Sequence, residues 1–336
     1  MGHTIALNFE DGVTRFIDCA PSETVVDASY RVGINIPLDC RDGACGTCKT
    51  FVESGSYSGG DYIEDALTDE EAAQGYALAC QMRPKSDLVL RVLASAEACK
   101  TRPAAHAASI ASLTRLSDTT TAFTLHTEGA PLGFLPGQYV NIQVPGTAHH
   151  RSYSFSSAPG AAQAGFLVRN IPGGQMTGFL AGAEPGAAIS FTGPIGSFYL
   201  RDVKRPVLML AGGTGLAPFL SMLGRLAETG CAHPVHLVYG VTRDADLVHV
   251  DDLAALAARL PGFSFVTVVA DDASAHPRKG WVTQHLDAAH LHGGDVDAYL
   301  CGPPPMVDAV RSHLQAQGVV PASFHFEKFA PSGVTA

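Results

Sequence analysis

The stretch Cys40-Arg41-Asp42-Gly43-Ala44-Cys45-Gly46-Thr47-Cys48, completed by Cys80 farther along the chain, decides the fold of the N-terminal region. Its C-x4-C-x2-C spacing with a distant fourth cysteine is the plant-type ligand pattern of a [2Fe–2S] cluster. Each iron takes two thiolates, and a tight loop can supply three of the four. Gly43 and Gly46 permit positive φ and bring backbone N–H groups close to the sulfurs. We therefore expect Cys40, Cys45, Cys48 and Cys80 to bind a [2Fe–2S] cluster.

Structural zinc and disulfides are the other common uses of four cysteines, and they fit this sequence less well. Structural zinc usually shows two C-x2-C knuckles, whereas Cys80 stands alone. Disulfides need an oxidising compartment, and residues 1–10 lack the basic and apolar regions of a signal peptide. We interpret Cys19, Cys99 and Cys231 as ordinary thiols.

Length, composition and charge limit the class of protein. The chain has 336 residues, 46% of them hydrophobic, and a formal net charge of −10. This length favours two or three domains, and the negative charge argues against a nucleic-acid partner. No apolar run reaches the roughly 18 residues needed to span a bilayer. We expect a cytoplasmic protein that does not associate with a membrane.

Acidic residues are concentrated near the cysteine region. Such a run is either a solvated surface or a docking face that steers a basic partner, and the sequence leaves both interpretations open. The residues are Asp61, Glu64, Asp65, Asp69, Glu70 and Glu71.

Residues 1–97 predict a small mixed fold. Asp11-Gly12 lies between two alternating runs, a strong hairpin signal. Thr24 and Thr68 each precede an acidic residue by three positions, the pattern of a helix N-cap. The expected strands are Thr4–Phe9, Val13–Asp18, Lys49–Glu53 and Leu88–Leu93. This order indicates a β-grasp domain.

Residues 98–108 contain a run of alanines and are interpreted as a linker. From 109 to 203, short strands are separated by glycine and proline, which predicts a small antiparallel barrel. The expected strands there are Ala122–Thr127, Tyr139–Val144, Phe166–Asn170 and Ala188–Thr192.

Residues 204–336 alternate between strand and helix, which predicts a parallel sheet with helices on both faces. The expected strands are Val207–Ala211, Val235–Gly240, Phe263–Ala270, Ala298–Cys301 and Ser323–Phe329. The expected helices are Ala217–Glu228, Asp251–Leu260, Trp281–His290 and Met306–Gln317.

Two motifs lie at the carboxyl ends of strands in this last region. Gly212-Gly213-Thr214-Gly215 follows a strand and opens a helix, so its backbone can approach a pyrophosphate. Pro218 occupies the last position of the G-x-G-x-x-G pattern, so the match is partial. Cys301-Gly302-Pro303 ends another strand, where open α/β sheets bind ligands. We expect a nicotinamide nucleotide there.

Two motifs of the middle region are candidates for contacts with a cofactor. In Arg151-Ser152-Tyr153-Ser154, an arginine can hold a phosphate, an aromatic ring can pack on a flavin and a hydroxyl can reach its N5. The same residues also suit a strand with an exposed arginine and a buried tyrosine. Gly173-Gly174-Gln175-Met176-Thr177 precedes a short helix and is a second candidate phosphate cradle.

Taken together, these motifs resemble a known family. The Arg151–Ser154, Gly212–Gly215 and Cys301–Pro303 motifs, followed by Phe326-Glu327-Lys328-Phe329, occur in the order of the ferredoxin–NADP⁺ reductase superfamily. With the ferredoxin-type region in front, the whole chain resembles the reductases of two-component ring-hydroxylating dioxygenases. The resemblance implies a β-grasp [2Fe–2S] domain, an FAD-binding β-barrel and a Rossmann-like NAD-binding domain. It further implies electron flow from NADH to FAD, to the cluster, and to the Rieske-type oxygenase of a benzoate-like aromatic acid.

The resemblance also assigns roles to residues. Arg151 would bind the FAD pyrophosphate, Tyr153 would pack on the flavin, and Phe329 would cover it. Ser154, Cys301 and Glu327 would be the catalytic residues, near flavin N5 and the hydride path. The implied cofactor-binding residues are Arg151, Ser152, Tyr153, Ser154, Val168, Gly173, Gly174, Met176, Thr177, Gly213, Thr214, Gly215, Arg243, Cys301, Gly302, Pro303 and Phe329.

Other functions share this domain order. The chain also resembles the reductases of di-iron monooxygenases that act on phenol or methane. A non-catalytic [2Fe–2S] sensor or carrier is a further hypothesis, which the flavin and nicotinamide motifs disfavour. Arg243 is the base nearest to the expected ribose, and a 2′-phosphate would require more than one. The acids Asp244 and Asp246 that follow favour NADH.

Overall fold

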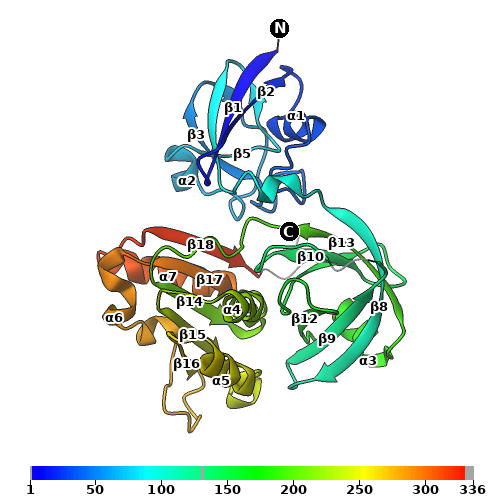
Figure 1. Ribbon diagram of the computed structural model, residues 1–336, viewed down its shortest axis with the longest axis vertical. Helices are drawn as coiled ribbons and strands as arrows, with labels where there is room; N and C mark the ends of the chain where they lie inside the picture. Colours follow the sequence, from blue (N-terminus) through cyan, green and yellow to red (C-terminus); the bar gives the residue numbers. More distant parts are fainter. Residues whose placement is uncertain (1, 130–131, 330–336) are drawn as a thin grey trace. The chain divides into compact units, whose positions relative to one another are not determined.

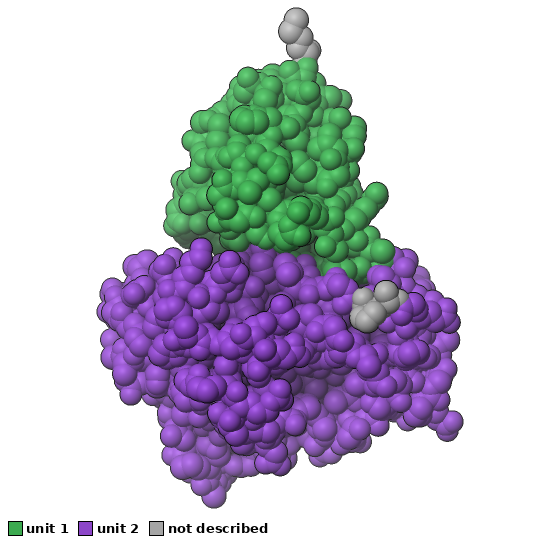
Figure 2. Space-filling model, viewed as in Figure 1, with its two compact units in different colours: residues 1–104, 193–197 green, residues 105–192, 198–336 purple. Residues whose placement is uncertain are grey.

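The computed structural model describes residues 2–129 and 132–329, which form two compact units (Figures 1 and 2). The first unit comprises Met1–Ala104 and Gly193–Ser197, and the second comprises Ala105–Thr192 and Phe198–Ala336. In the part of the chain that the structure describes, no helix is both long and apolar enough to cross a bilayer.

The first unit is built on a mixed sheet with the strand order β2-β1-β7-β3-β5. Strands β1 and β7 run parallel, while the other neighbours run antiparallel. Ile5, Leu7 and Leu90 of the central strands are buried, as are Val25 and Val26 of helix α1. The elements are β1 (His3–Phe9), β2 (Thr14–Cys19), α1 (Val25–Arg31), β3 (Lys49–Ser54), β4 (Tyr57–Ser58), α2 (Asp69–Ala73), β5 (Tyr76–Leu78), β6 (Arg83–Pro84), β7 (Leu88–Val92) and η1 (Ala98–Lys100). This sheet and its helix confirm the β-grasp prediction.

Both predicted helix caps of this unit are present. The Thr24 hydroxyl accepts a hydrogen bond from the Asp27 N–H at 3.2 Å and starts α1. At α2 the cap is reciprocal: Thr68 accepts from the Glu71 N–H, and the Glu71 carboxylate accepts from the Thr68 N–H. These bonds satisfy N–H groups that a helix start leaves unpaired.

The barrel of the second unit is an antiparallel sheet in the order β11-β10-β13-β8-β9-β12. A bridge between Phe155 and Phe166 joins its two edge strands and nearly closes it. Phe123 and Phe155 flank Phe166 in the core, with ring centroids 5.2 and 5.3 Å from it. The elements are β8 (Ala104–Arg115), β9 (Thr120–Thr127), β10 (Tyr139–Gln143), β11 (His150–Ser154), β12 (Ala164–Arg169), α3 (Gln175–Gly182) and β13 (Ala188–Ile195).

Strand β8 is the longest element that the predicted strand ranges did not include. It begins at Ala104, within the segment interpreted as a linker, and continues to Arg115. Its alanines and serines carry little of the alternation that identifies a strand. Its pairing with β9, with a register shift between Ile110 and Ser112, stabilises it in spite of this weak pattern.

The parallel sheet of the second unit has the order β16-β15-β14-β17-β18. Side chains alternate between two cores. Met209 faces helices α4 and α5, whereas Leu208 faces α6 and α7. The elements are β14 (Val207–Gly212), η2 (Gly213–Leu216), α4 (Ala217–Thr229), β15 (Val235–Val241), η3 (Asp244–Asp246), α5 (Val250–Arg259), β16 (Phe263–Val269), η4 (Val282–His285), α6 (Ala288–Leu291), η5 (His292–Gly294), β17 (Asp297–Gly302), α7 (Pro304–Ala316) and β18 (Ser323–Lys328). The order reverses between β14 and β17, and such switch points carry ligand sites.

One predicted helix is broken in two. The segment expected as Trp281–His290 forms the short turn η4 and the separate helix α6. Between them the backbone at Leu286 and Asp287 is extended, and the Asp287 carboxylate accepts from the Ala289 N–H at 2.8 Å. Asp287 therefore acts as the N-cap of a new helix, which an apolar periodicity does not reveal.

Candidate functional site

The four cysteines of the first unit lie in two pairs. The thiols of Cys40 and Cys45 share a hydrogen bond, and so do those of Cys48 and Cys80. Within the described ranges, no three His, Cys, Asp or Glu side chains are arranged to hold a single metal ion. Two irons that each take two thiolates require a pairwise arrangement. The donor set fits a [2Fe–2S] cluster.

The backbone of the cysteine loop leaves no space for side chains at its glycines. A Cβ on Gly43 would lie 2.4 Å from the Asp61 carbonyl oxygen, and one on Gly46 would lie 2.9 Å from that of Ala66. Both glycines have positive φ. The Cys80 N–H points at the Cys48 sulfur at 3.4 Å. The close approach of backbone N–H groups to sulfur is thus a feature of the loop.

In each thiol pair the hydrogen bond lowers the pKa of one cysteine and raises the pKa of its partner, Cys40 or Cys48. A hydrogen bond from Cys40 lowers the pKa of Cys45 to about 6, and a hydrogen bond from Cys48 lowers the pKa of Cys80 to about 7. Thiolates, not thiols, are metal ligands.

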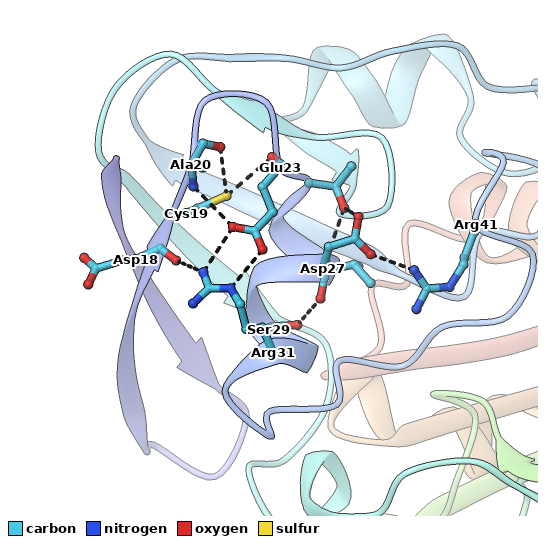
Figure 3. Close-up of polar contacts among 10 residues, drawn as sticks. Asp18, Cys19, Ala20, Glu23, Asp27, Ser29, Arg31 and Arg41 are labelled. Carbon is cyan, nitrogen blue, oxygen red and sulfur yellow. Dashed lines mark hydrogen bonds and ion pairs between the residues drawn. The ribbon is translucent and has the colours of Figure 1, made fainter. Parts of the chain in front are cut away.

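Helix α1 is tied to the cysteine loop by an ion pair that the sequence did not suggest (Figure 3). The Asp27 carboxylate lies 2.6 Å from Nη1 of Arg41 and accepts from the Thr24 hydroxyl at 2.7 Å. Burial opposes ionisation of Asp27, but these two partners outweigh it and lower its pKa. Arg41 has a φ of 67°, unusual for a residue other than glycine. The ion pair therefore anchors a strained position of the loop.

Strand β11 carries the predicted flavin-binding motif in the barrel. Tyr153 packs edge to face against Phe123, with ring centroids 6.3 Å apart, and burial raises its pKa. The Ser152 hydroxyl donates to Asn141 at 2.7 Å, and Arg151 donates to the carbonyl of His150 at 2.8 Å. Ser154 is buried. Strand and cofactor interpretations are therefore compatible, because the barrel wall itself presents these residues.

The second predicted cradle lies at the start of helix α3. Gly173 has a φ of 71°, and the N-cap Gly174 provides no side-chain cap. The Thr177 hydroxyl accepts from the Ile171 N–H at 3.0 Å, so its own proton points elsewhere. The first N–H groups of an uncapped helix suit a phosphate.

Val168 and Met176 belong to the barrel core through their side chains. Only their backbone groups are therefore left to contact a cofactor.

The two nucleotide motifs of the parallel sheet pack directly against each other. A Cβ on Gly212 would lie 2.5 Å from the sulfur of Met306, and one on Gly215 would lie 2.3 Å from the Cys301 carbonyl oxygen. Helix α4 follows the first motif, helix α7 follows Pro303, and neither has a side-chain cap. Two helix starts thus meet at the switch point between β14 and β17, where open α/β sheets bind ligands.

The three predicted catalytic residues come together. Cys301 and Glu327 are register partners on β17 and β18, and the Ser154 hydroxyl donates to Glu327 Oε2 at 3.1 Å. Cys301 is fully buried. Glu327 keeps some surface exposure, but the protein around it raises its pKa to about 8, and only the bond from Ser154 acts in the opposite direction. A protonated carboxyl group therefore faces a hydroxyl from the barrel at neutral pH.

Phe329 and Arg243 lie at the two sides of this region. The Phe329 N–H donates to the Gly302 carbonyl at 2.8 Å, and its ring packs against the apolar core shared with α4. Arg243 forms an ion pair with Asp246 at 3.2 Å. Asp246 also accepts a hydrogen bond from Thr119 of the barrel, a contact that no sequence motif indicated.

Three family matches divide the chain in the same order as these sites. Residues 8–85 match the 2Fe-2S iron-sulfur cluster binding domain, residues 107–199 the oxidoreductase FAD-binding domain, and residues 209–312 the oxidoreductase NAD-binding domain.

Similar proteins extend over the whole chain. The toluate 1,2-dioxygenase electron transfer component of Pseudomonas putida is 56% identical over 99% of this chain and 100% of its own length. The 2-halobenzoate 1,2-dioxygenase electron transfer component of Burkholderia cepacia is 52% identical, over 99% of each chain. The crystal structure of an Amycolatopsis cytochrome P450 reductase aligns with a TM-score of 0.74 at 33% identity, covering 98% of this chain and 100% of the other.

Proposed function

Because this chain belongs to the family of electron transfer components of aromatic-ring 1,2-dioxygenases, we propose that it is the reductase of a benzoate 1,2-dioxygenase. It is a flavin-dependent NADH oxidoreductase that uses FAD and a [2Fe–2S] cluster and delivers electrons to an oxygenase. The proposal adds that this oxygenase is of the Rieske type. It also places the protein in the cytoplasm, where NADH is available.

We propose the division into residues 1–97 for the cluster, 98–108 as linker, 109–203 for FAD and 204–336 for NADH. The matches over residues 8–85 and 209–312 fall inside these limits and support them. The FAD-binding match begins at residue 107 and strand β8 begins at Ala104, so the linker ends a few residues earlier than 108. Arg151, Tyr153 and the start of α3 would hold FAD, and the Gly213–Gly215 and Cys301–Pro303 segments would hold the nicotinamide nucleotide.

Bound FAD supplies the conversion of a hydride into single electrons, which the cluster can carry. The residues of the chain orient the bound cofactors and hold a proton. In our proposal Ser154 and Glu327 hold a proton between the barrel and the parallel sheet. Cys301, buried next to Glu327, excludes water from that side. The observation that carries this proposal is the contact between Ser154 and Glu327.

An anaerobic visible spectrum, recorded before and after one equivalent of NADH, tests the electron path. Flavin bands and a broad iron–sulfur absorbance should both bleach. A protein that holds a cluster but no flavin, or that NADH leaves unchanged, would instead be a carrier or a sensor.

The identity of the partner needs a second experiment. The purified protein is combined in turn with the oxygenase components for benzoate, toluate, anthranilate and phenol, and NADH-dependent product is measured. The benzoate oxygenase should give the highest kcat/KM for the reductase. A higher value with the toluate, anthranilate or phenol oxygenase would contradict the proposal.

A further inference from the structure

Arg243 donates a set of hydrogen bonds to one carboxylate, that of Asp246. Its Nε and Nη2 atoms donate to Asp246 at 3.2 and 3.3 Å, and its backbone N–H donates to the same carboxylate at 3.2 Å. Such a bidentate arrangement directs the planar guanidinium toward one acid. About half of the Arg243 side chain is exposed, at 51%, whereas that of Asp246 is only 11% exposed. The exposed Arg243 side chain is thus held in place by the nearly buried Asp246 carboxylate.

Asp246 also links the two domains of the second unit. Asp246 accepts a hydrogen bond from the Thr119 hydroxyl at 2.5 Å, and Thr119 lies in the turn between β8 and β9 of the barrel. The Tyr239 hydroxyl donates to the backbone carbonyl of Asp246 at 3.4 Å. The Asp246 carboxylate therefore cannot turn toward a ligand without losing its contact with the barrel.

Arg243 follows strand β15, which lies beside β14 with Gly240 paired to Gly212. The carboxyl ends of these strands form the edge where a dinucleotide binds. A 2′-phosphate of NADPH needs a free base at this edge. Arg243 is committed to Asp246, and Asp118 and Asp271 add negative charge around it.

We propose that Asp246 is a positioning residue for nucleotide choice: it occupies Arg243 and so makes the chain favour NADH over NADPH. This inference rests on the proposed site of the nicotinamide nucleotide. It explains how a sequence with an arginine at this edge can still reject a 2′-phosphate.

The test is the ratio of the dissociation constants of NADP⁺ and NAD⁺, measured by calorimetry on the FAD-loaded, full-length protein. Asp246→Asn should lower this ratio about tenfold, because a released guanidinium gains one charge-assisted bond to the phosphate. The double variant Asp246→Asn with Arg243→Ala should lose that gain. The ratio of kcat/KM for NADPH to kcat/KM for NADH should rise correspondingly.

Asp244→Asn is the matched control, since Asp244 lies in the same turn but accepts from Ser274 instead of holding Arg243. It removes the same charge and should leave the ratio within about twofold, a small fraction of one charge-assisted bond. Thr119→Val keeps the Asp246 carboxylate and removes only the hydrogen bond that it accepts from Thr119. This variant provides the test if Asp246→Asn fails to fold. It should lower the ratio by less than Asp246→Asn does.

An equal shift in Asp244→Asn, or an unchanged ratio in both Asp246→Asn and Thr119→Val, would overturn the role of Asp246. A wild-type protein that bound neither nucleotide would instead overturn the proposed function.

Discussion

Two domains contribute to the surroundings of Glu327. Its backbone belongs to the parallel sheet, and its carboxyl group meets the hydroxyl of Ser154 from the barrel. The surrounding protein raises its pKa to about 8. A carboxyl group that stays protonated at neutral pH can donate as well as accept a hydrogen bond.

Glu327 should also make stability depend on pH. An unfolded glutamate releases its proton near 4.3, whereas folded Glu327 keeps it up to about 8. The folded state thus binds one more proton across this window, and stability falls as pH rises through it, by on the order of 1 kcal/mol per pH unit. Relative to Glu327→Gln, the wild type should lose Tm steadily between pH 5 and 8.

Ser154→Ala is the companion variant, because the hydrogen bond from Ser154 lowers the pKa of Glu327. Without this bond the pKa of Glu327 should rise further, so the fall in Tm should continue to a higher pH than in the wild type. Parallel Tm curves for the wild type and Glu327→Gln across this range would show that Glu327 titrates normally.

His236 should produce the opposite slope. Its ring stacks on His290 with centroids 3.5 Å apart, and its Nδ1 lies 2.8 Å from the Ser264 hydroxyl. Burial first, and then the charge of His290, lower the pKa of His236 to about 4. An unfolded histidine takes its proton near 6.5, so stability is lost as pH falls from 6.5 toward 4.

Chemical denaturation of the wild type and His236→Gln at pH 7.5, 6 and 4.5 tests this effect. The wild type should lose more free energy of unfolding than the variant, by on the order of 1 kcal/mol per pH unit in this window. A larger loss in the variant would contradict it.

At the scale of elements, the cysteine loop and the turn after helix α1 each contribute one of a matched pair of glycines. Gly43 and Gly33 share nearly the same positive φ, 83° and 79°. A Cβ on Gly43 would meet the Asp61 carbonyl at 2.4 Å, whereas one on Gly33 would meet nothing within 4 Å. Gly43→Ala should therefore lower the iron bound per chain by severalfold. Gly33→Ala carries only the backbone strain of about 1 kcal/mol and should keep its iron.

Iron and acid-labile sulfide per chain, measured after purification at one temperature, decide the comparison. Equal iron loss in the two variants would assign the effect to φ rather than to the contact with Asp61.

Helices and strands were predictable where burial leaves a recognisable pattern of apolar residues in the sequence. The central strands β14, β15 and β17 of the parallel sheet are buried on both faces, so they appear as mostly apolar runs. Strand β8 lacks such a trace because alanine and serine fill most of it. The break at Asp287 arises from a cap within an otherwise helical segment. The caps at Thr24 and Thr68 were predictable because they depend on neighbours three residues away.

At the scale of the whole molecule, the cluster and the flavin site belong to different compact units. Cys80→Ser should therefore remove electron transfer to the oxygenase by at least a hundredfold. Reduction of the flavin by NADH should stay within about threefold of the wild type, because separate units respond independently to distant changes. Anaerobic stopped-flow absorbance separates the two steps.

The control is Cys19→Ser, which alters a buried thiol that hydrogen-bonds to the carbonyls of Ala20 and Glu23 instead of joining the loop pairs. It should retain both steps. Loss of flavin reduction in Cys80→Ser would show that the units depend on each other for folding.

Most of the candidate site was predicted from motifs, because cysteine spacing and glycine-rich turns are visible in short stretches of sequence. Contacts between distant segments did not. Thr119 and Asp246 meet only after the barrel and the sheet have formed, and neither belongs to a motif. The Asp27–Arg41 pair was hidden for the same reason, since its aspartate also reads as a helix cap.

Helices α3, α4 and α7 begin without a side-chain cap, in contrast to α1 and α2. In our proposal a phosphate of FAD completes the start of α3, so the supply of this cofactor affects the lifetime of the protein. A chain made when flavin is scarce opens its barrel more often, and proteases degrade opened chains. Cells that lack flavin would thus clear a protein that cannot accept electrons from NADH.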